Sequence, residues 1–149
     1  MTRADDIEDI RQLTYKYFWG WDIDDVDVAT EVFTVDGTHD ETALGSYKVR
    51  GHDELRANFA KYRPTMTHSF HMVGNHIIEL DDTDHAHGTS YFDGVAVLRD
   101  GTEVSGKHAF VDTYVRTDAG WRIATRTVRT LTPTTGPWEE SVDFDSLKP

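Results

Sequence analysis

Four strand-like segments follow one another in the second half of the chain, and this pattern most constrains the fold. They cover residues 68–80, 85–98, 103–116 and 120–132. Short sequences typical of hairpin turns separate them: Asp81–Asp84, Arg99–Gly101 and Thr117–Gly120. Because hairpins join antiparallel neighbours, we expect an antiparallel meander over this half of the chain.

The first half of the chain has the residue spacing of helices. Residues 5–21 carry apolar side chains three and four positions apart: Ile7, Ile10, Leu13, Tyr17 and Trp21. A shorter helix is predicted over 25–33, and a short strand within 34–42. A third helix is predicted from His52 to Arg63, and Pro64 ends it.

This order of elements predicts one α+β domain over residues 1–132. We expect a curved, mixed but mostly antiparallel sheet, wrapped by three N-terminal helices into a cone around an apolar pocket. Residues 133–149 hold three of the four prolines together with Trp138, Phe144 and Leu147. We expect this tail to pack over the pocket or against a neighbouring subunit.

Charge and composition exclude several classes of function. The 27 acidic residues exceed the 15 basic ones, and the net charge of −12 argues against nucleic acids and anionic membranes as partners. There is no cysteine, so disulfides, thiolate nucleophiles and cysteine metal sites are excluded. The first residues lack the apolar core of a signal peptide, and we expect a soluble, cytoplasmic protein. No cofactor motif is present.

Most charged and histidine residues are interpreted as surface. The stretch from Asp22 to Glu41 holds eight acidic residues and no basic one, and most of these are expected to be solvated. His85 and His87 lie on one face of a strand and could ligate a metal, but they follow an acidic turn. We therefore predict no metal site. His76 is predicted to face away from His71, because their separation is odd.

His71 and Asp22 are the strongest candidates for chemistry. Alternation along the strand places His71, Val73 and Asn75 on one face. A buried, hydrogen-bonded core histidine is the alternative interpretation of His71. Asp22 follows Trp21 on the apolar side of the first helix, where a carboxylate needs a partner. An Asp–His pair would fix the imidazole tautomer and provide a general base.

Several short motifs, in this order, resemble the SnoaL-like family of the nuclear transport factor two-like superfamily. Scytalone dehydratase, related dehydratases and a dehydrochlorinase are members. The matching segments are Trp21–Asp25, Phe33, Gly51, His71–Asn75, Asp112–Arg116, Gly120–Ile123 and the tail Trp138–Asp145. The resemblance implies the cone-shaped fold, and it covers nearly the whole chain.

The resemblance also implies roles for particular residues. Asp22 and His71 match the dyad in which the histidine removes a proton and the aspartate orients it. His108 is expected to act as a second acid or base. The expected substrate-binding residues are Tyr17, Trp21, Phe33, Asn75, Phe110 and Arg126.

These observations predict a cofactor-independent lyase of the dehydratase type, acting on a small, largely apolar cyclic substrate. The alternatives are a double-bond isomerase of a ketone or steroid-like substrate, a non-catalytic binding protein, and a structural assembly domain. The resemblance favours a homo-oligomer, a trimer over a dimer.

Overall fold

The computed structural model describes residues 2–132, so the predicted tail at 133–149 lies outside the described residues. A single six-stranded sheet has the order β2-β1-β6-β5-β4-β3. Its pairs are antiparallel except β1 with β6, which is parallel. The elements are α1 Arg3–Ile23, α2 Val26–Thr30, β1 Phe33–Asp40, η1 Thr42–Leu44, β2 Lys48–Arg50, α3 Gly51–Tyr62, η2 Arg63–Thr65, β3 Met66–Leu80, β4 His85–Leu98, β5 Glu103–Thr117 and β6 Gly120–Thr130.

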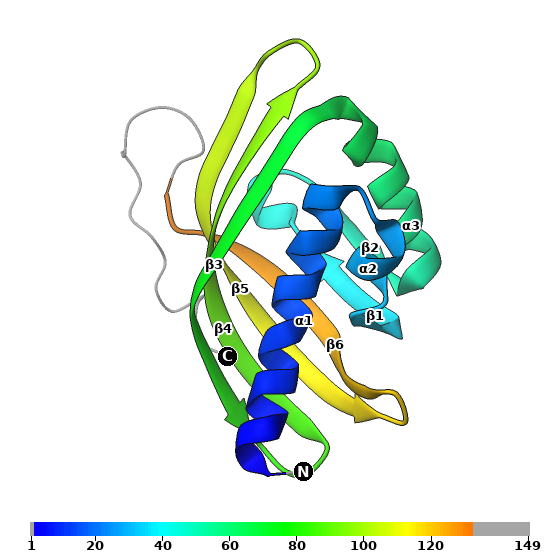
Figure 1. Cartoon of the computed structure of the whole chain (residues 1–149), viewed down its shortest axis with the longest axis vertical. Helices are drawn as coiled ribbons and strands as arrows, with labels where there is room; N and C mark the ends of the chain where they lie inside the picture. Colours follow the sequence, from blue (N-terminus) through cyan, green and yellow to red (C-terminus); the bar gives the residue numbers. More distant parts are fainter. Residues whose placement is uncertain (1, 133–149) are drawn as a thin grey trace.

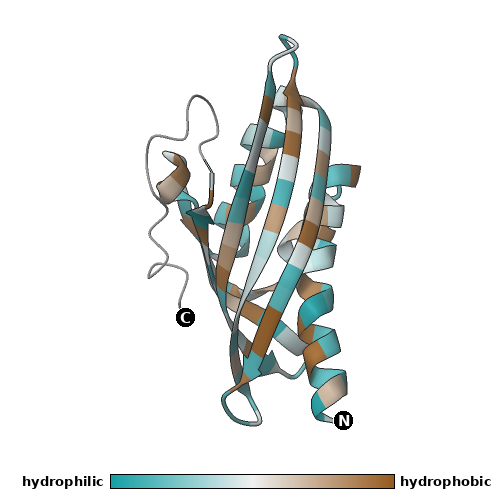
Figure 2. Ribbon diagram, turned by 90° about the vertical axis from the view of Figure 1, so that its left-hand side faces the viewer, coloured by the Kyte–Doolittle hydropathy of each residue, from teal (hydrophilic) through white to brown (hydrophobic). Residues whose placement is uncertain are grey.

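The predicted fold class is confirmed. The long strands curve, and the helices lie together on one side of the sheet, with α1 running across it (Figure 1). In the described part of the chain, no helix covers the other side of the long strands, where hydrophilic and hydrophobic bands succeed one another along each strand (Figure 2). No helix among residues 2–132 is long and apolar enough to span a membrane.

Helix α1 begins at a capping box and ends at a left-handed residue. The Thr2 hydroxyl accepts a hydrogen bond from the Asp5 backbone N–H, and the Asp5 carboxylate accepts one from the Thr2 N–H at 2.7 Å. Asp24 caps the other end with φ 64°. Ile10 and Leu13 from the predicted stripe are buried against the sheet. The helix thus carries Trp21 and Asp22 on its last turn.

The predicted second helix over 25–33 is too long. Helix α2 ends at Thr30, and Phe33 begins strand β1, where it is the parallel partner of Ile123 in β6. Val32 and Phe33 are a β-branched and an aromatic residue, which pack well on a sheet. Phe33 is therefore buried in the core between the sheet and α1, at 1% exposure.

Strand β3 departs from simple alternation. Its register with β4 shifts between Gly74 and Ile77, and Asn75 has φ 49°. Such a bulge reverses the faces of the residues that follow it. Asn75 is exposed, whereas His76 is partly buried and contacts the Tyr114 hydroxyl at 3.1 Å. The predictions that Asn75 shares a face with His71 and that His76 faces away were therefore wrong.

Candidate active site

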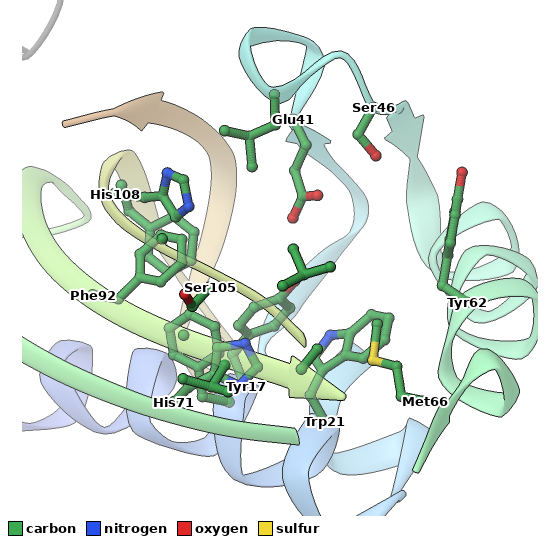
Figure 3. Close-up of a pocket in the computed structure, with 18 of the residues that line it drawn as sticks. Tyr17, Trp21, Glu41, Ser46, Tyr62, Met66, His71, Phe92, Ser105 and His108 are labelled. Atoms are coloured by element: carbon green, nitrogen blue, oxygen red, sulfur yellow. The ribbon is translucent and has the colours of Figure 1, made fainter. Parts of the chain in front are cut away.

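A cavity of about 350 Å³ lies between the last turns of α1, the concave face of β4 and β5, and the segment that follows β1. Its wall is mostly apolar and aromatic. Its polar side chains come from different elements, as in many small-molecule sites. Residues drawn around the cavity in Figure 3 include Tyr17, Trp21, Glu41, His71, Phe92 and His108.

Asp22 and His71 meet at the edge of this cavity. The Asp22 Oδ1 atom lies 2.8 Å from His71 Nδ1 and accepts a hydrogen bond from the Ser69 hydroxyl at 2.8 Å. The other oxygen accepts the His71 backbone N–H at 3.0 Å. Burial by itself would raise the pKa of Asp22, but these hydrogen bonds outweigh it, so the pKa lies below its ordinary value. The carboxylate therefore stays ionised and holds the imidazole.

The His71 ring lies between the Phe18 ring and the backbone of Gly94. It stacks on Phe18, with ring centroids 4.1 Å apart and an interplanar angle of 15°. Gly94 lies opposite it on β4, where an added Cβ would sit 2.9 Å from His71 Cδ2 and 3.3 Å from Nε2. Since Nδ1 donates to the Asp22 carboxylate, Nε2 is the nitrogen that carries the lone pair in the neutral form of the ring. This ring lines the cavity, so the site presents an oriented base to it.

Four further predicted site residues also line the cavity: Tyr17, Trp21, His108 and Phe110. His108 is 6% exposed, and its Nδ1 has no hydrogen-bond partner among residues 2–132. Burial lowers the pKa of His108, which favours the uncharged ring. A neutral imidazole can both donate and accept a hydrogen bond, so His108 can contact a polar group of a ligand.

Three predicted substrate-binding residues do not line the cavity: Phe33, Asn75 and Arg126. Phe33 lies in the core, and Asn75 points outward beyond the β3 bulge. Arg126 is fully buried, where its Nη2 lies 2.6 Å from Asp112 Oδ2 and donates to Thr14 at 2.7 Å. Its guanidinium carbon lies 3.8 Å from the centre of the Phe110 ring. Arg126 therefore supports the wall of the cavity.

The sequence interpretation missed Glu41. It was grouped with solvated acidic residues, yet its side chain is 21% exposed and lines the cavity. Burial raises the pKa of Glu41 to about 7, although a hydrogen bond with Tyr47 and the charge of Arg126 each lower it. Strand alternation was the sequence signal that could have placed Glu41 inside. It places His39 and Glu41 on one face, and Asp40 on the other with Lys48 at 3.0 Å.

His85 and His87 each pair with a nearby aspartate. His85 contacts Asp82 at 3.0 Å, and His87 contacts Asp81 at 2.8 Å, both beside the turn after β3. Within residues 2–132, no group of three or more histidine, cysteine, aspartate or glutamate side chains could hold a metal ion.

Fold and cavity together define a class of small α+β proteins that enclose a pocket between a curved sheet and N-terminal helices. The family model of the SnoaL-like domain matches residues 2–127, so the chain belongs to the SnoaL-like family. The predicted family is therefore confirmed. No curated protein matches the chain.

Three solved structures illustrate the likeness. A putative aromatic ring hydroxylase from Novosphingobium aromaticivorans has 27% identity and a TM-score of 0.86, over 92% of this chain and 96% of that one. A putative scytalone dehydratase from the same organism has 16% identity and a TM-score of 0.80, over 93% and 92%. A hexachlorocyclohexane dehydrochlorinase from Novosphingobium barchaimii has 16% identity and a TM-score of 0.79, over 93% and 94%.

Proposed function

We propose that the chain is a cofactor-independent lyase that eliminates water from a small, largely apolar cyclic molecule. The observation that carries this proposal is the Asp22–His71 pair at the wall of an aromatic cavity. His71 Nε2 removes a proton from a carbon beside an activating group, and Asp22 stabilises the imidazolium that forms. A positioned general base of this kind contributes roughly 10²–10⁴-fold to the rate.

The surroundings of the pair support this chemistry. Phe18 stacks on the imidazole, and Phe92 and Phe110 add apolar wall on which a ring can pack. Apolar walls exclude water, which would otherwise compete with substrate for the base. His108 lies on the same wall and is suited to hydrogen-bond a leaving hydroxyl group.

Elimination is the reaction that the descriptions of two similar structures name. A dehydratase and a dehydrochlorinase, as two of the similar structures are described, both remove a proton and a neighbouring leaving group. A double-bond isomerase is the second candidate, because the same oriented base could return its proton to a different carbon of the substrate.

A panel of cyclic β-hydroxy ketones, beginning with 3-hydroxycyclohexanone and its aryl-substituted analogues, tests the proposal. Dehydration gives a conjugated enone that absorbs in the ultraviolet. We expect turnover by the wild type, and a loss of about 10²–10⁴-fold in kcat for His71→Asn and for Asp22→Asn. His68→Asn is the matched control, because His68 is an exposed histidine of the same strand outside the cavity.

Two outcomes would count against the lyase. If His71→Asn and Asp22→Asn dehydrate the panel as fast as the wild type, the pair is not the base. If the wild type binds these ketones without converting any of them, the cavity belongs to a binding protein. Product analysis by NMR separates the enone of a lyase from the shifted double bond of an isomerase.

A further inference from the structure

Glu41 faces the same cavity as His71 from a different wall. It follows β1 directly, whereas His71 belongs to β3. In Figure 3 the Glu41 carboxyl group reaches into the cavity from one side and the His71 ring lies at another. The two groups are thus presented to one bound molecule from separate elements.

Among residues 2–132, Glu41 has a hydrogen bond with Tyr47 but no ion pair with a lysine or arginine. Its Oε1 lies 3.3 Å from His39 Nε2, but burial lowers the pKa of His39 to about 3, so this ring is uncharged. Arg126 is the cation that acts on it, and Asp112 already binds Arg126 through three contacts of 3.2 Å or less. A carboxylate in such a place is costly, whereas a neutral carboxyl group is a good hydrogen-bond donor.

The other titratable groups on or behind the wall of this cavity come from several elements, while its β4 and η1 lining residues are not titratable. They are Tyr17 of α1, His39 of β1, Tyr47 before β2, Tyr62 of α3, His71 of β3, His108 of β5 and Arg126 of β6. Burial raises the pKa of Tyr17 and of Tyr47, so both remain hydroxyl groups near neutrality. None of these other groups is a carboxyl group. Glu41 is the carboxyl group that lines the cavity, and its pKa is about 7.

We propose that Glu41 is the acid partner of His71, and that its carboxyl group donates a hydrogen bond to an oxygen atom of an uncharged cyclic ketone or alcohol. The catalytic half of this assignment rests on the proposed lyase function, but the binding half does not. The substrate class is thereby narrowed to neutral molecules with an oxygen acceptor. Binding of carboxylate-bearing rings is disfavoured at pH values where Glu41 is ionised, because the two carboxylates would repel each other.

The elimination balances with these two groups. His71 Nε2 takes the proton from carbon, and the electron pair of that C–H bond becomes the new C=C bond. The neighbouring C–O bond breaks, and its oxygen leaves as water with the proton of Glu41. The site then holds an imidazolium at His71 and a carboxylate at Glu41. Transfer of one proton between them through solvent restores the starting state.

Equilibrium binding of a matched pair of probes tests the assignment. The ketone 2-acetylnaphthalene has an acceptor oxygen and no charge, and 2-ethylnaphthalene has nearly the same shape without the oxygen. If only the protonated form of Glu41 binds the ketone, its Kd rises about tenfold between pH 6 and pH 8. The Kd of 2-ethylnaphthalene stays level, because that probe accepts no hydrogen bond.

Variants identify the group that causes the pH dependence. In Glu41→Gln the ketone binds with the same Kd at both pH values, because the amide donates a hydrogen bond and does not titrate. Glu31→Gln removes an equal charge from an exposed site and retains the tenfold change. The infrared carbonyl stretch of the bound ketone at pH 6 shifts to lower frequency in the wild type, and this shift is lost in Glu41→Leu.

His71→Asn separates failure of this assignment from failure of the lyase proposal. We expect this variant to keep the pH-dependent binding of the ketone while losing the base. If pH dependence disappears in His71→Asn and persists in Glu41→Gln, or if both probes show it equally, the assignment to Glu41 is wrong. Absence of ketone binding to the wild type at pH 6 would also overturn it. If the binding results are as expected and only the dehydration assay fails, the hydrogen bond from Glu41 to the ketone is supported and the lyase reaction is not.

Discussion

At the scale of single residues, the geometry of the base depends on a glycine. The His71 ring lies between Phe18 and Gly94, and Asp22 holds one of its nitrogens. Alternation and the inward position of Asp22 predicted this meeting of aspartate and histidine. The sequence did not predict that Gly94 leaves room for the His71 ring. The pairing of β3 with β4 decides which residue lies opposite His71.

We predict that Gly94→Ala displaces the imidazole without unfolding the protein. The new methyl group would lie 2.9 Å from His71 Cδ2, so the ring must move away from its place beside Asp22. A displacement of this kind costs about 10²-fold in kcat. Turnover of the β-hydroxy ketone panel and the ¹⁵N shifts of the His71 ring measure it. Unchanged turnover with an unchanged ring spectrum would contradict the prediction.

At the scale of elements, the hairpin of β3 and β4 is shaped by the bulge at Asn75. The predicted elements agree well with the observed ones: His52–Arg63 became α3 at Gly51–Tyr62, and the strand predicted over 85–98 is β4 at His85–Leu98. The bulge itself escaped prediction, since alternation was extended through it. Its position follows from the match of β3 to β4, which no local pattern contains.

Two glycines of this hairpin are expected to respond differently to the same change. A Cβ at Gly88 would lie 2.5 Å from the backbone oxygen of Ile77, whereas one at Gly74 would meet nothing within 4 Å. Gly88→Ala should lower the free energy of unfolding by about 1–3 kcal/mol, because the two strands must separate. Gly74→Ala is the control, with a change within about 0.5 kcal/mol. Urea unfolding compares them, and equal losses would refute this account.

At the scale of the whole molecule, a buried polar network connects α1 with three strands. Arg126 of β6 contacts Asp112 of β5 and Thr14 of α1, and Asp112 accepts the Tyr114 hydroxyl at 2.9 Å. His76 of β3 contacts the same hydroxyl at 3.1 Å. The network fixes the helix to the sheet beneath the cavity, and it places a positive charge behind the Phe110 ring.

Breaking this network is expected to be costly. Asp112→Asn leaves the Arg126 guanidinium buried without its counter-ion, which costs roughly 3–5 kcal/mol in the free energy of unfolding. The double variant Asp112→Leu/Arg126→Met removes both charges and should lose less than the single variant. Equilibrium urea unfolding of the single and double variants measures the difference. A double variant that is less stable than the single one would contradict this expectation.

The sequence by itself determined the first and third helices, the four-strand meander, the family and the pairing of Asp22 with His71. Periodicity and turn residues are local properties, and they fix which side of its own element a side chain occupies. The tertiary structure alone decided that Arg126 pairs with Asp112 behind the cavity wall, that Asn75 points outward, and that Glu41 lies in the cavity. Burial, loss of solvation and charge pairing act through space, so they depend on elements that lie far away along the chain.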